Sequence, residues 1–327
     1  MKDVPASRFS FVFSLLVVLL IFVPKVHGAE KHLAYLVPDA RIPFWNIMAD
    51  GIRHEAAELD YRISVYSAEN QAKKELEFTA RAIREEVDGI ILSPTNSSAA
   101  VTVLKLAEQA GIPVVISDIG ADADNYVSYI KSNNYQGAYD LGEMLALKME
   151  DKGWSNGTVG IIAIPQKRDN GKARTRGFLD ALEEQGIGSA GIFQQSDFSY
   201  RETYDFTRKL IARHADLRAI WLQGSNRYQA ALDAMADAGK ADQLLLICFD
   251  AEPEFLDMIA SGELVGAGMQ QPFLMGEKAV DTMDLHLHGR KVKKIQQVDV
   301  LPVSGRNLDQ WLPLIMRNVL GHRMESQ

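Results

Sequence analysis

The sequence predicts an α/β protein made of two doubly wound parallel-sheet lobes. From residue 31 onward, short and almost continuously apolar runs alternate with amphipathic stretches of helical length. Strands buried on both faces and separated by helices have this pattern. The alternation comes in two successive series of similar size, with no low-complexity linker between them. The length of 327 residues suits two lobes of about 100–150 residues each.

The first series begins with a buried strand at 32–37, which Pro38 ends. Further strands are expected at 63–66, 89–94 and 113–118, and helices at 44–60, 71–87 and 97–110. Gly111 directly follows the last of these helices, where a glycine provides a good C-cap.

The second series begins after a short strand at 127–130. Strands are expected at 158–164, 191–195, 219–222, 244–250 and 265–269. Helices are expected near 134–151, 171–185, 201–214, 226–238 and 253–261. In His286-Leu287-His288 the two imidazoles face different sides of a helix, so we expect a solvated helix end there and no metal site.

The N-terminus has the pattern of an export signal. Lys2 and Arg8 precede the apolar run Phe9–Val23, which is shorter than the ~20 residues of a spanning helix. Val26-His27-Gly28 provides small residues suited to signal peptidase, so cleavage is predicted after Gly28. The mature chain is expected in the periplasm. The alternative is an uncleaved N-terminal anchor.

The charge of the chain excludes some partners. Removal of residues 1–28 takes away three basic residues and one acidic residue and changes the formal net charge from −8 to −10. An acidic surface repels nucleic acid and anionic lipid. The single cysteine, Cys248, lies in an apolar run, and we expect a buried structural thiol.

Aromatic and polar side chains follow the predicted strands. Ligands of open parallel sheets bind beyond the carboxyl ends of the strands, and two facing lobes bring those ends to one cleft. Flat rings cover the apolar faces of a sugar, and carboxylates accept from adjacent hydroxyls. Arg176, near a helix start, offers a planar fork of donors. The strand-end residues are Phe44, Trp45, Asp118, Phe198, Asp250 and Gln270.

Each of these residues also has a purely structural interpretation. An aromatic pair at a helix start often packs into a core, and an aspartate after a strand often caps the next helix. An arginine on a helix is usually hydrated. The functional interpretation rests on their coincidence at the strand ends of both lobes.

Several segments between residues 31 and 302 have the order and spacing of one family. They are Pro43-Phe44-Trp45, Asp88 to Thr95, Ala110 to Val115, Ser132-Asn133-Asn134, Ala173 to Phe178, Phe249-Asp250 and Gln270. With these segments the chain resembles the ribose/galactose type of periplasmic sugar-binding protein, which shares its fold with the ligand-binding half of lactose-repressor-like regulators.

The resemblance implies a type I periplasmic binding fold, with a three-segment hinge crossed near 130–133, 268–272 and 299–303. We assign residues 1–28 to the signal peptide. The N-terminal lobe is expected to comprise 29–131 and 271–300. The C-terminal lobe and tail are expected to comprise 132–270 and 301–327.

The resemblance also implies ligand contacts for the strand-end residues and for Arg176. Ribose-binding relatives have Asn in place of Ile42, Arg in place of Ile119 and Asn in place of Gly224, where Ser225 or Asn226 is a candidate substitute. Lost hydrogen bonds at ~0.5–1.5 kcal/mol each argue against ribose itself. A less hydroxylated, methylated or differently sized ligand is expected. The lost Arg also leaves the two aspartates less neutralised, which disfavours an anion and would tolerate a cation.

The leading hypothesis is a solute receptor that captures a small neutral sugar or polyol for the membrane permease of an ABC importer. The alternative is a sensory subunit that signals through a membrane histidine kinase or chemoreceptor. An enzyme is disfavoured, because Pro38–Pro43 stands where a G-x-G-x-x-G would be needed. We therefore expect no cofactor, no metal and no nucleic acid, and we expect a monomer.

Overall fold

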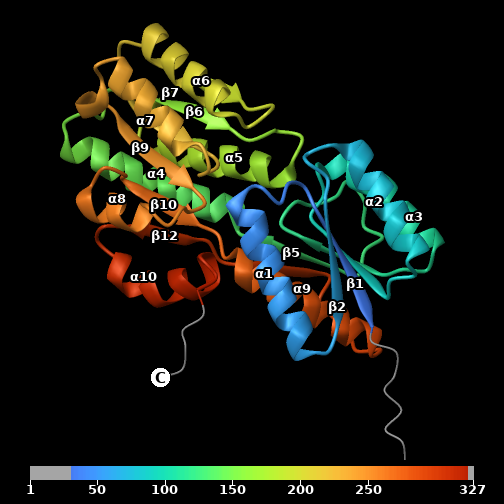
Figure 1. The fold of residues 1–327 in the computed structure, drawn as a ribbon. Helices are drawn as coiled ribbons and strands as arrows, with labels where there is room; N and C mark the ends of the chain where they lie inside the picture. Colours follow the sequence, from blue (N-terminus) through green and yellow to red (C-terminus); the bar gives the residue numbers. More distant parts are fainter. Residues whose placement is uncertain (1–30, 323–327) are drawn as a thin grey trace, which may run out of the picture. The chain divides into compact units, whose positions relative to one another are not determined.

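Two six-stranded β-sheets organise residues 31–322, which are the residues that the computed structural model describes (Figure 1). The predicted signal peptide and its cleavage site lie outside the described residues. Each sheet with its helices forms one lobe, as the fold class predicts.

The sheet of the first lobe is parallel throughout, in the order β11-β5-β4-β3-β1-β2. Its strands are β1 (His32–Val37), β2 (Arg62–Ser67), β3 (Gly89–Leu92), β4 (Val114–Ser117), β5 (Ser128–Ser132) and β11 (Ile295–Val298).

The sheet of the second lobe has the order β12-β10-β9-β8-β6-β7, and only β12 runs antiparallel to its neighbour. Its strands are β6 (Thr158–Ala163), β7 (Gly188–Gln194), β8 (Leu217–Leu222), β9 (Leu245–Phe249), β10 (Gly266–Met269) and β12 (Leu301–Ser304). In both lobes the first five strands in chain order are arranged 2-1-3-4-5, a doubly wound order whose ligands bind beyond the carboxyl ends of the strands.

Side chains of the first sheet alternate between two helical layers. Leu33 and Tyr35 pack with α1 (Pro43–Glu58) and α9 (Pro272–Leu287). Ala34 and Leu36 point to the other face, towards α2 (Ala72–Arg84) and α3 (Ser97–Gln109). This alternation is the two-residue period of a strand. It explains why the run at 32–37 is continuously apolar.

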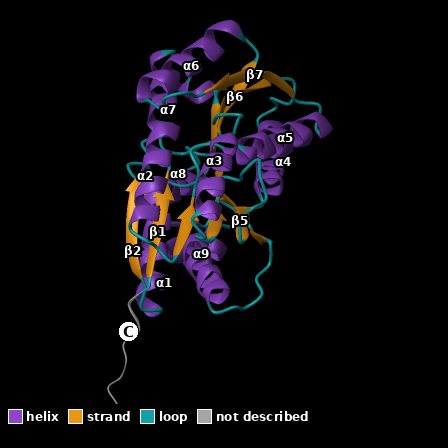
Figure 2. Cartoon of the chain, turned by 90° about the vertical axis from the view of Figure 1, so that its right-hand side faces the viewer, coloured by secondary structure: helices purple, strands orange, loops and turns teal. Residues whose placement is uncertain are grey.

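The second sheet is covered in the same way (Figure 2). Ile161 and Trp221 pack with α4 (Asn134–Asp151) and α5 (Asp169–Glu184). Ile162 and Leu222 face the opposite layer, which contains α6 (Tyr200–Arg213), α7 (Tyr228–Asp237) and α8 (Phe255–Ser261). Cys248 belongs to this layer and is a free, buried thiol, as predicted.

The chain passes between the two sheets three times, after β5, after β10 and between β11 and β12. These passages fall within the three ranges expected for the hinge. The lobe boundaries at 131/132, 270/271 and 300/301 stay a prediction, because residues 31–322 belong to one compact unit.

The predicted helices and strands before residue 270 are present, with ends shifted by a few residues. Beyond residue 270 the sequence pattern predicts only the helix end at 286–288, which the end of α9 confirms. The polar edge strand β11 and the short β12, α10 (Leu308–Leu314) and π-helical Ile315–Val319 were not predicted. Among residues 31–322, no helix combines the length and apolar character needed to cross a membrane.

Two glycines allow α4 and α5 to approach each other closely. A Cβ atom on Gly177 would lie 2.1 Å from the carbonyl oxygen of Tyr135, and one on Gly142 would lie 2.6 Å from Cβ of Ala181. This contact fixes α5, whose first turns carry side chains of the ligand cavity described below.

Gly177→Ala is expected to destabilise the protein by about 1–3 kcal/mol through overpacking, although alanine favours helix by about 1 kcal/mol over glycine. The measurement is the melting temperature followed by circular dichroism. Gly188→Ala is the matched control, because its new Cβ would meet only Thr158 Cγ2, at an ordinary 3.4 Å. Equal melting temperatures for Gly177→Ala and the wild type would contradict this packing.

Candidate ligand-binding site

A cavity of about 50 Å³ lies where the carboxyl ends of the strands of both lobes meet. All of the sequence-predicted residues except Arg176 line it, namely Phe44, Trp45, Asp118, Phe198, Ser225, Asn226, Asp250 and Gln270. The further lining residues are Ile42, Ile164, Arg168, Asn170, Arg174 and Gly224.

Aromatic rings from both lobes contribute to the wall. Phe44 and Trp45 begin α1, where Pro43 occupies the first turn, and their rings meet edge-to-face at 4.8 Å and 88°. Phe198 comes from the second lobe, between β7 and α6. Rings of this kind provide flat, apolar surfaces on which the C–H face of a sugar packs.

Three lining residues have left-handed backbone. Asp118 and Asp250 both have φ of 68°, and Phe198 has φ of 57°. Such conformations cost on the order of 1–3 kcal/mol in non-glycine residues and cluster at ligand sites. The two aspartates follow β4 and β9, equivalent strands of the two lobes, so the same local geometry turns a carboxylate into the cleft from each side.

Asp118 is almost fully buried, with 1 % of its surface exposed. Its Oδ2 accepts a hydrogen bond from Asn170 Nδ2 at 2.9 Å, whereas its buried Oδ1 accepts none from any described residue. Burial raises the pKa of this carboxyl to about 6, and the positive charges of Arg174 and Arg168 oppose that rise. An unsatisfied buried acceptor is costly, so Oδ1 is suited to receive a ligand hydroxyl.

Asp250 is held by one hydrogen bond and one ion pair. Gln270 Nε2 donates to its Oδ1 at 2.5 Å, and Arg174 Nη1 lies 3.6 Å from its Oδ2. Burial raises the pKa of Asp250, and the charge of Arg174 counteracts this. The Oε1 atom of Gln270 is a second buried acceptor without a described donor.

Arg174 is fixed in one orientation. Its Nε donates to Asn134 Oδ1 at 2.8 Å, and its Nη1 donates to the carbonyl oxygen of Gln223 at 2.7 Å. The guanidinium carbon lies 3.9 Å from the centre of the Phe249 ring. Only 2 % of Arg174 is exposed, so the fork of donors is held in place before any ligand binds.

Arg176, the arginine predicted from the sequence, lies elsewhere. Its side chain is 78 % exposed and pairs with Asp180 on the outside of α5. The two arginines are about 200° apart around a helix of 3.6 residues per turn, and Arg174 belongs to the buried stripe with Gly171 and Phe178. That spacing distinguishes the two arginines in the sequence, and we replace Arg176 by Arg174 in the candidate site.

Ser225 and Asn226, which follow Gly224, differ in their hydrogen bonding. Ser225 Oγ donates to Glu252 Oε1 at 2.8 Å, and Glu252 has a pKa raised to about 7 by burial. Asn226 lines the cavity beside it. Both expected substitutes for the missing asparagine therefore reach the cavity, and Ser225 is already engaged.

Arg168 and Asn170 were not predicted. They lie at the junction between β6 and α5, which begins at Asp169, two residues before the expected helix. In the sequence, Lys167-Arg168-Asp169 looks like a hydrated turn, yet Arg168 is only 7 % exposed. Only the folded arrangement brings this guanidinium into the cleft.

Arg168 changes the charge balance of the cavity. Asp118 and Asp250 face two guanidiniums, those of Arg168 and Arg174, so the lining charges are balanced. Ile119, where the resemblance implies an arginine in ribose binders, is fully buried in the core of the first lobe. The expected tolerance of a cationic ligand rested on the loss of that arginine, and Arg168 removes its basis.

The matching family model describes a periplasmic binding protein domain and spans residues 33–291. The chain belongs to this periplasmic binding protein family. It is 29 % identical over 281 residues to the ribose import binding protein RbsB of Haemophilus influenzae, covering 85 % of this chain and 92 % of that protein.

Solved structures of similar fold include a sugar-binding relative. An ABC transporter solute-binding protein from Agrobacterium vitis with bound D-fucose has a TM-score of 0.78 and 26 % identity, covering 89 % of this chain and 100 % of that one. One from Bacillus halodurans with bound myo-inositol has a TM-score of 0.79 and 20 % identity, covering 87 % and 98 %. The relatives are binding proteins of a periplasmic family, and the type I fold expected from the sequence is confirmed.

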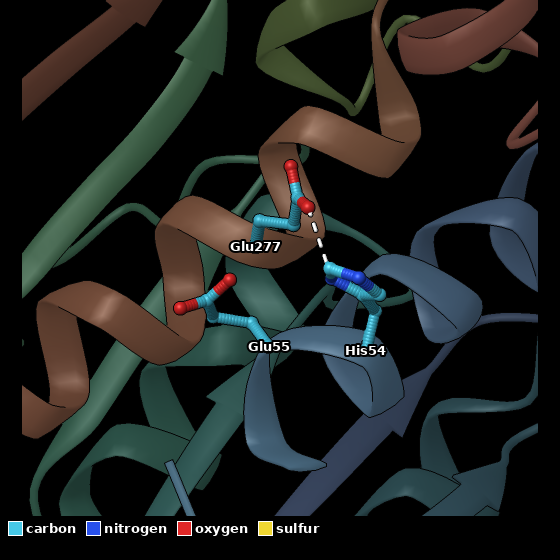
Figure 3. Close-up of side chains that lie close together, drawn as sticks. All are labelled: His54, Glu55 and Glu277. Atoms are coloured by element: carbon cyan, nitrogen blue, oxygen red, sulfur yellow. Dashed lines mark ion pairs between the residues drawn. The ribbon is translucent and has the colours of Figure 1, made fainter. Parts of the chain in front are cut away.

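A second group of ionisable residues lies between α1 and α9 (Figure 3), and it contains His54, Glu55 and Glu277. His54 Nδ1 lies 3.1 Å from Glu277 Oε1. Glu277 also accepts two hydrogen bonds of 2.9 Å from Arg317. A guanidinium that already neutralises this carboxylate disfavours a metal cation beside it, so Glu277 is better described as the ion-pair partner of Arg317.

A buried carboxylate behind the cavity makes stability depend on pH. Glu75, on α2, is 1 % exposed and accepts from the backbone N–H of Thr95 at 2.6 Å. Burial raises its pKa from 4.5 to about 7. Between about pH 4.5 and pH 7 the folded state therefore holds a proton that the unfolded state has lost. The stability associated with this protonated carboxyl is complete below about pH 4.5 and disappears as the pH rises through 7.

Glu75→Gln is expected to flatten the decline of the melting temperature between pH 5 and pH 8, because glutamine retains the acceptor without titrating. Thermal unfolding at a series of pH values measures the slope. Glu77→Gln, an exposed substitution on the same helix, should leave the slope unchanged. A slope that Glu75→Gln does not alter would show that the carboxyl is ionised in the folded protein.

Proposed function

We propose that this protein captures a small neutral sugar or polyol in the periplasm and delivers it to the membrane permease of an ABC importer. The observation that carries the proposal is a pair of buried, unsatisfied acceptors, Asp118 Oδ1 and Gln270 Oε1, at a cavity lined by aromatic rings. The hydroxyl groups of a sugar or polyol donate to such acceptors. The apolar C–H faces of its ring pack on the aromatic side chains.

Each group has a role in this proposal. Trp45, Phe44 and Phe198 cover the apolar faces of the ligand. Asp118 and Gln270 accept from hydroxyls, while Arg174 favours the ionised form of Asp250 and donates to a ring or hydroxyl oxygen. Because these groups come from both lobes, the ligand favours the closed state by its greater affinity for it. We also propose that the protein acts without catalysis and as a monomer.

Charge and polarity narrow the ligand. Two carboxylates opposite two guanidiniums favour a neutral molecule over either ion. Ile42 lines the cavity, where the resemblance implies asparagine in ribose binders, so a ligand with a methyl, methylene or C–H group at this position is favoured over ribose. The import role of the Haemophilus influenzae relative and the sugar-bound Agrobacterium vitis relative support uptake as the purpose of capture.

A thermal-shift screen of the chain from Ala29 onward tests the function. The panel contains D-ribose, D-fucose, deoxypentoses, myo-inositol, amino sugars and sugar acids. A neutral member present at 100 times its Kd should stabilise the protein by about 2.7 kcal/mol. Stabilisation only by the charged members, the amino sugars and the sugar acids, would contradict the proposed ligand class.

Arg174→Ala is expected to weaken binding of the best ligand from the screen by at least about tenfold, because a hydrogen bond to a charged group contributes about 1.5–3 kcal/mol. Isothermal titration calorimetry measures the affinity. Arg176→Ala is the matched control from the same helix and should bind as the wild type does. The opposite result, with Arg176→Ala impaired and Arg174→Ala unaffected, would restore the original assignment.

A further inference from the structure

Three consecutive residues of the second lobe hydrogen-bond to the first lobe across the cleft. Arg168 Nε donates to the carbonyl oxygen of Thr95 at 3.1 Å, and Arg168 Nη2 donates to Asn70 Oδ1 at 3.1 Å. The backbone N–H of Asp169 donates to Ser97 Oγ at 3.3 Å. Asn170 Nδ2 donates to Asp118 Oδ2. We call Arg168–Asn170 the interlobe latch.

The receiving groups of the first lobe are held ready. Asn70 has left-handed backbone with φ of 59°, and its Nδ2 donates to Asp39 Oδ2 at 3.2 Å. Thr95 is fixed by Glu75, which accepts from both its backbone N–H and its hydroxyl. Acceptors that are already oriented lose little conformational freedom when a donor arrives.

Arg168 is buried only because the lobes meet. Its guanidinium carbon lies 5.4 Å from the centre of the Phe198 ring, and its bonded acceptors belong to the opposite lobe. Burial lowers the pKa of Arg168 to about 10, while the charge of Asp118 favours its cation. A buried guanidinium needs such partners, and both acceptors of its hydrogen bonds belong to the first lobe.

We propose that Arg168 and Asn170 are positioning residues that hold the cleft closed even without ligand and orient Asp118 for binding. Asn170 occupies Asp118 Oδ2 and leaves Oδ1 directed to the ligand. A protein that is already biased towards closure binds its ligand with higher apparent affinity, because less binding free energy is used to populate the binding-competent state. The ligand-free closure stands independently of the proposed function, and only its effect on affinity rests on that function.

The test uses small-angle X-ray scattering of the ligand-free chain from Ala29 onward, after dialysis from denaturant to remove carried-over ligand. The wild type is expected to have the radius of gyration of the closed arrangement. Arg168→Ala and Asn70→Ala should each increase the radius of gyration. The double variant should open little further than Arg168→Ala, because both substitutions remove the Arg168–Asn70 hydrogen bond. Arg168→Lys should restore part of the closure.

Lys167→Ala, an exposed neighbour of the latch, is the matched control and should scatter as the wild type does. Melting temperatures separate opening from unfolding, and Asn70→Ala and Asn170→Ala keep the test valid if Arg168→Ala does not fold. A wild type that is as open as the variants, or latch variants as compact as the wild type, would overturn the proposal. Neither result depends on finding the ligand, so failure here leaves the ligand screen intact.

Discussion

The structure depends on the burial of two carboxylates and two guanidiniums where the strand ends of two parallel sheets face each other. None of these charges is tolerable alone in such a place, since desolvation of an unpaired ion costs several kcal/mol. Arg174 supports Asp250 from within the second lobe. Asn170 reaches Asp118 from the opposite lobe. The meeting of the lobes therefore gives Asp118 its partner, whereas Asp250 and Arg174 are paired within the second lobe.

The same constraint explains the strained backbone at the site. Asp118 and Asp250 occupy equivalent places after β4 and β9, with the same φ of 68°. Both carboxylates line the cavity, and a left-handed backbone at a non-glycine residue persists only where the surrounding structure imposes it. Duplication of the strand order thus produces a site with one acid from each half.

Much of the fold could be predicted from the sequence, because buried parallel strands are continuously apolar and the intervening helices have clear periodicity. The lining aspartates could be predicted because they directly follow such strands, and the aromatics because they lie in the connections between a strand and the next helix or at that helix's start. The elements after β10 lack this pattern: Ile295–Val298 forms an edge strand with exposed residues. Arg168 escaped prediction for another reason, since its burial depends on the approach of a lobe that is distant in sequence. Arg176 is on the exposed face of α5, whereas Arg174 is on its buried face. The spacing of Gly171, Arg174 and Phe178 along the helix could have identified Arg174 as the buried arginine.

The most direct test of the account is a crystal structure with the sugar or polyol that stabilises the protein most. The account predicts a ligand between the lobes, with its ring against Trp45 or Phe198 and its hydroxyls about 2.5–3.0 Å from Asp118 Oδ1 and Gln270 Oε1. A ligand bound outside this cleft, or one that leaves both acceptors unsatisfied, would contradict it.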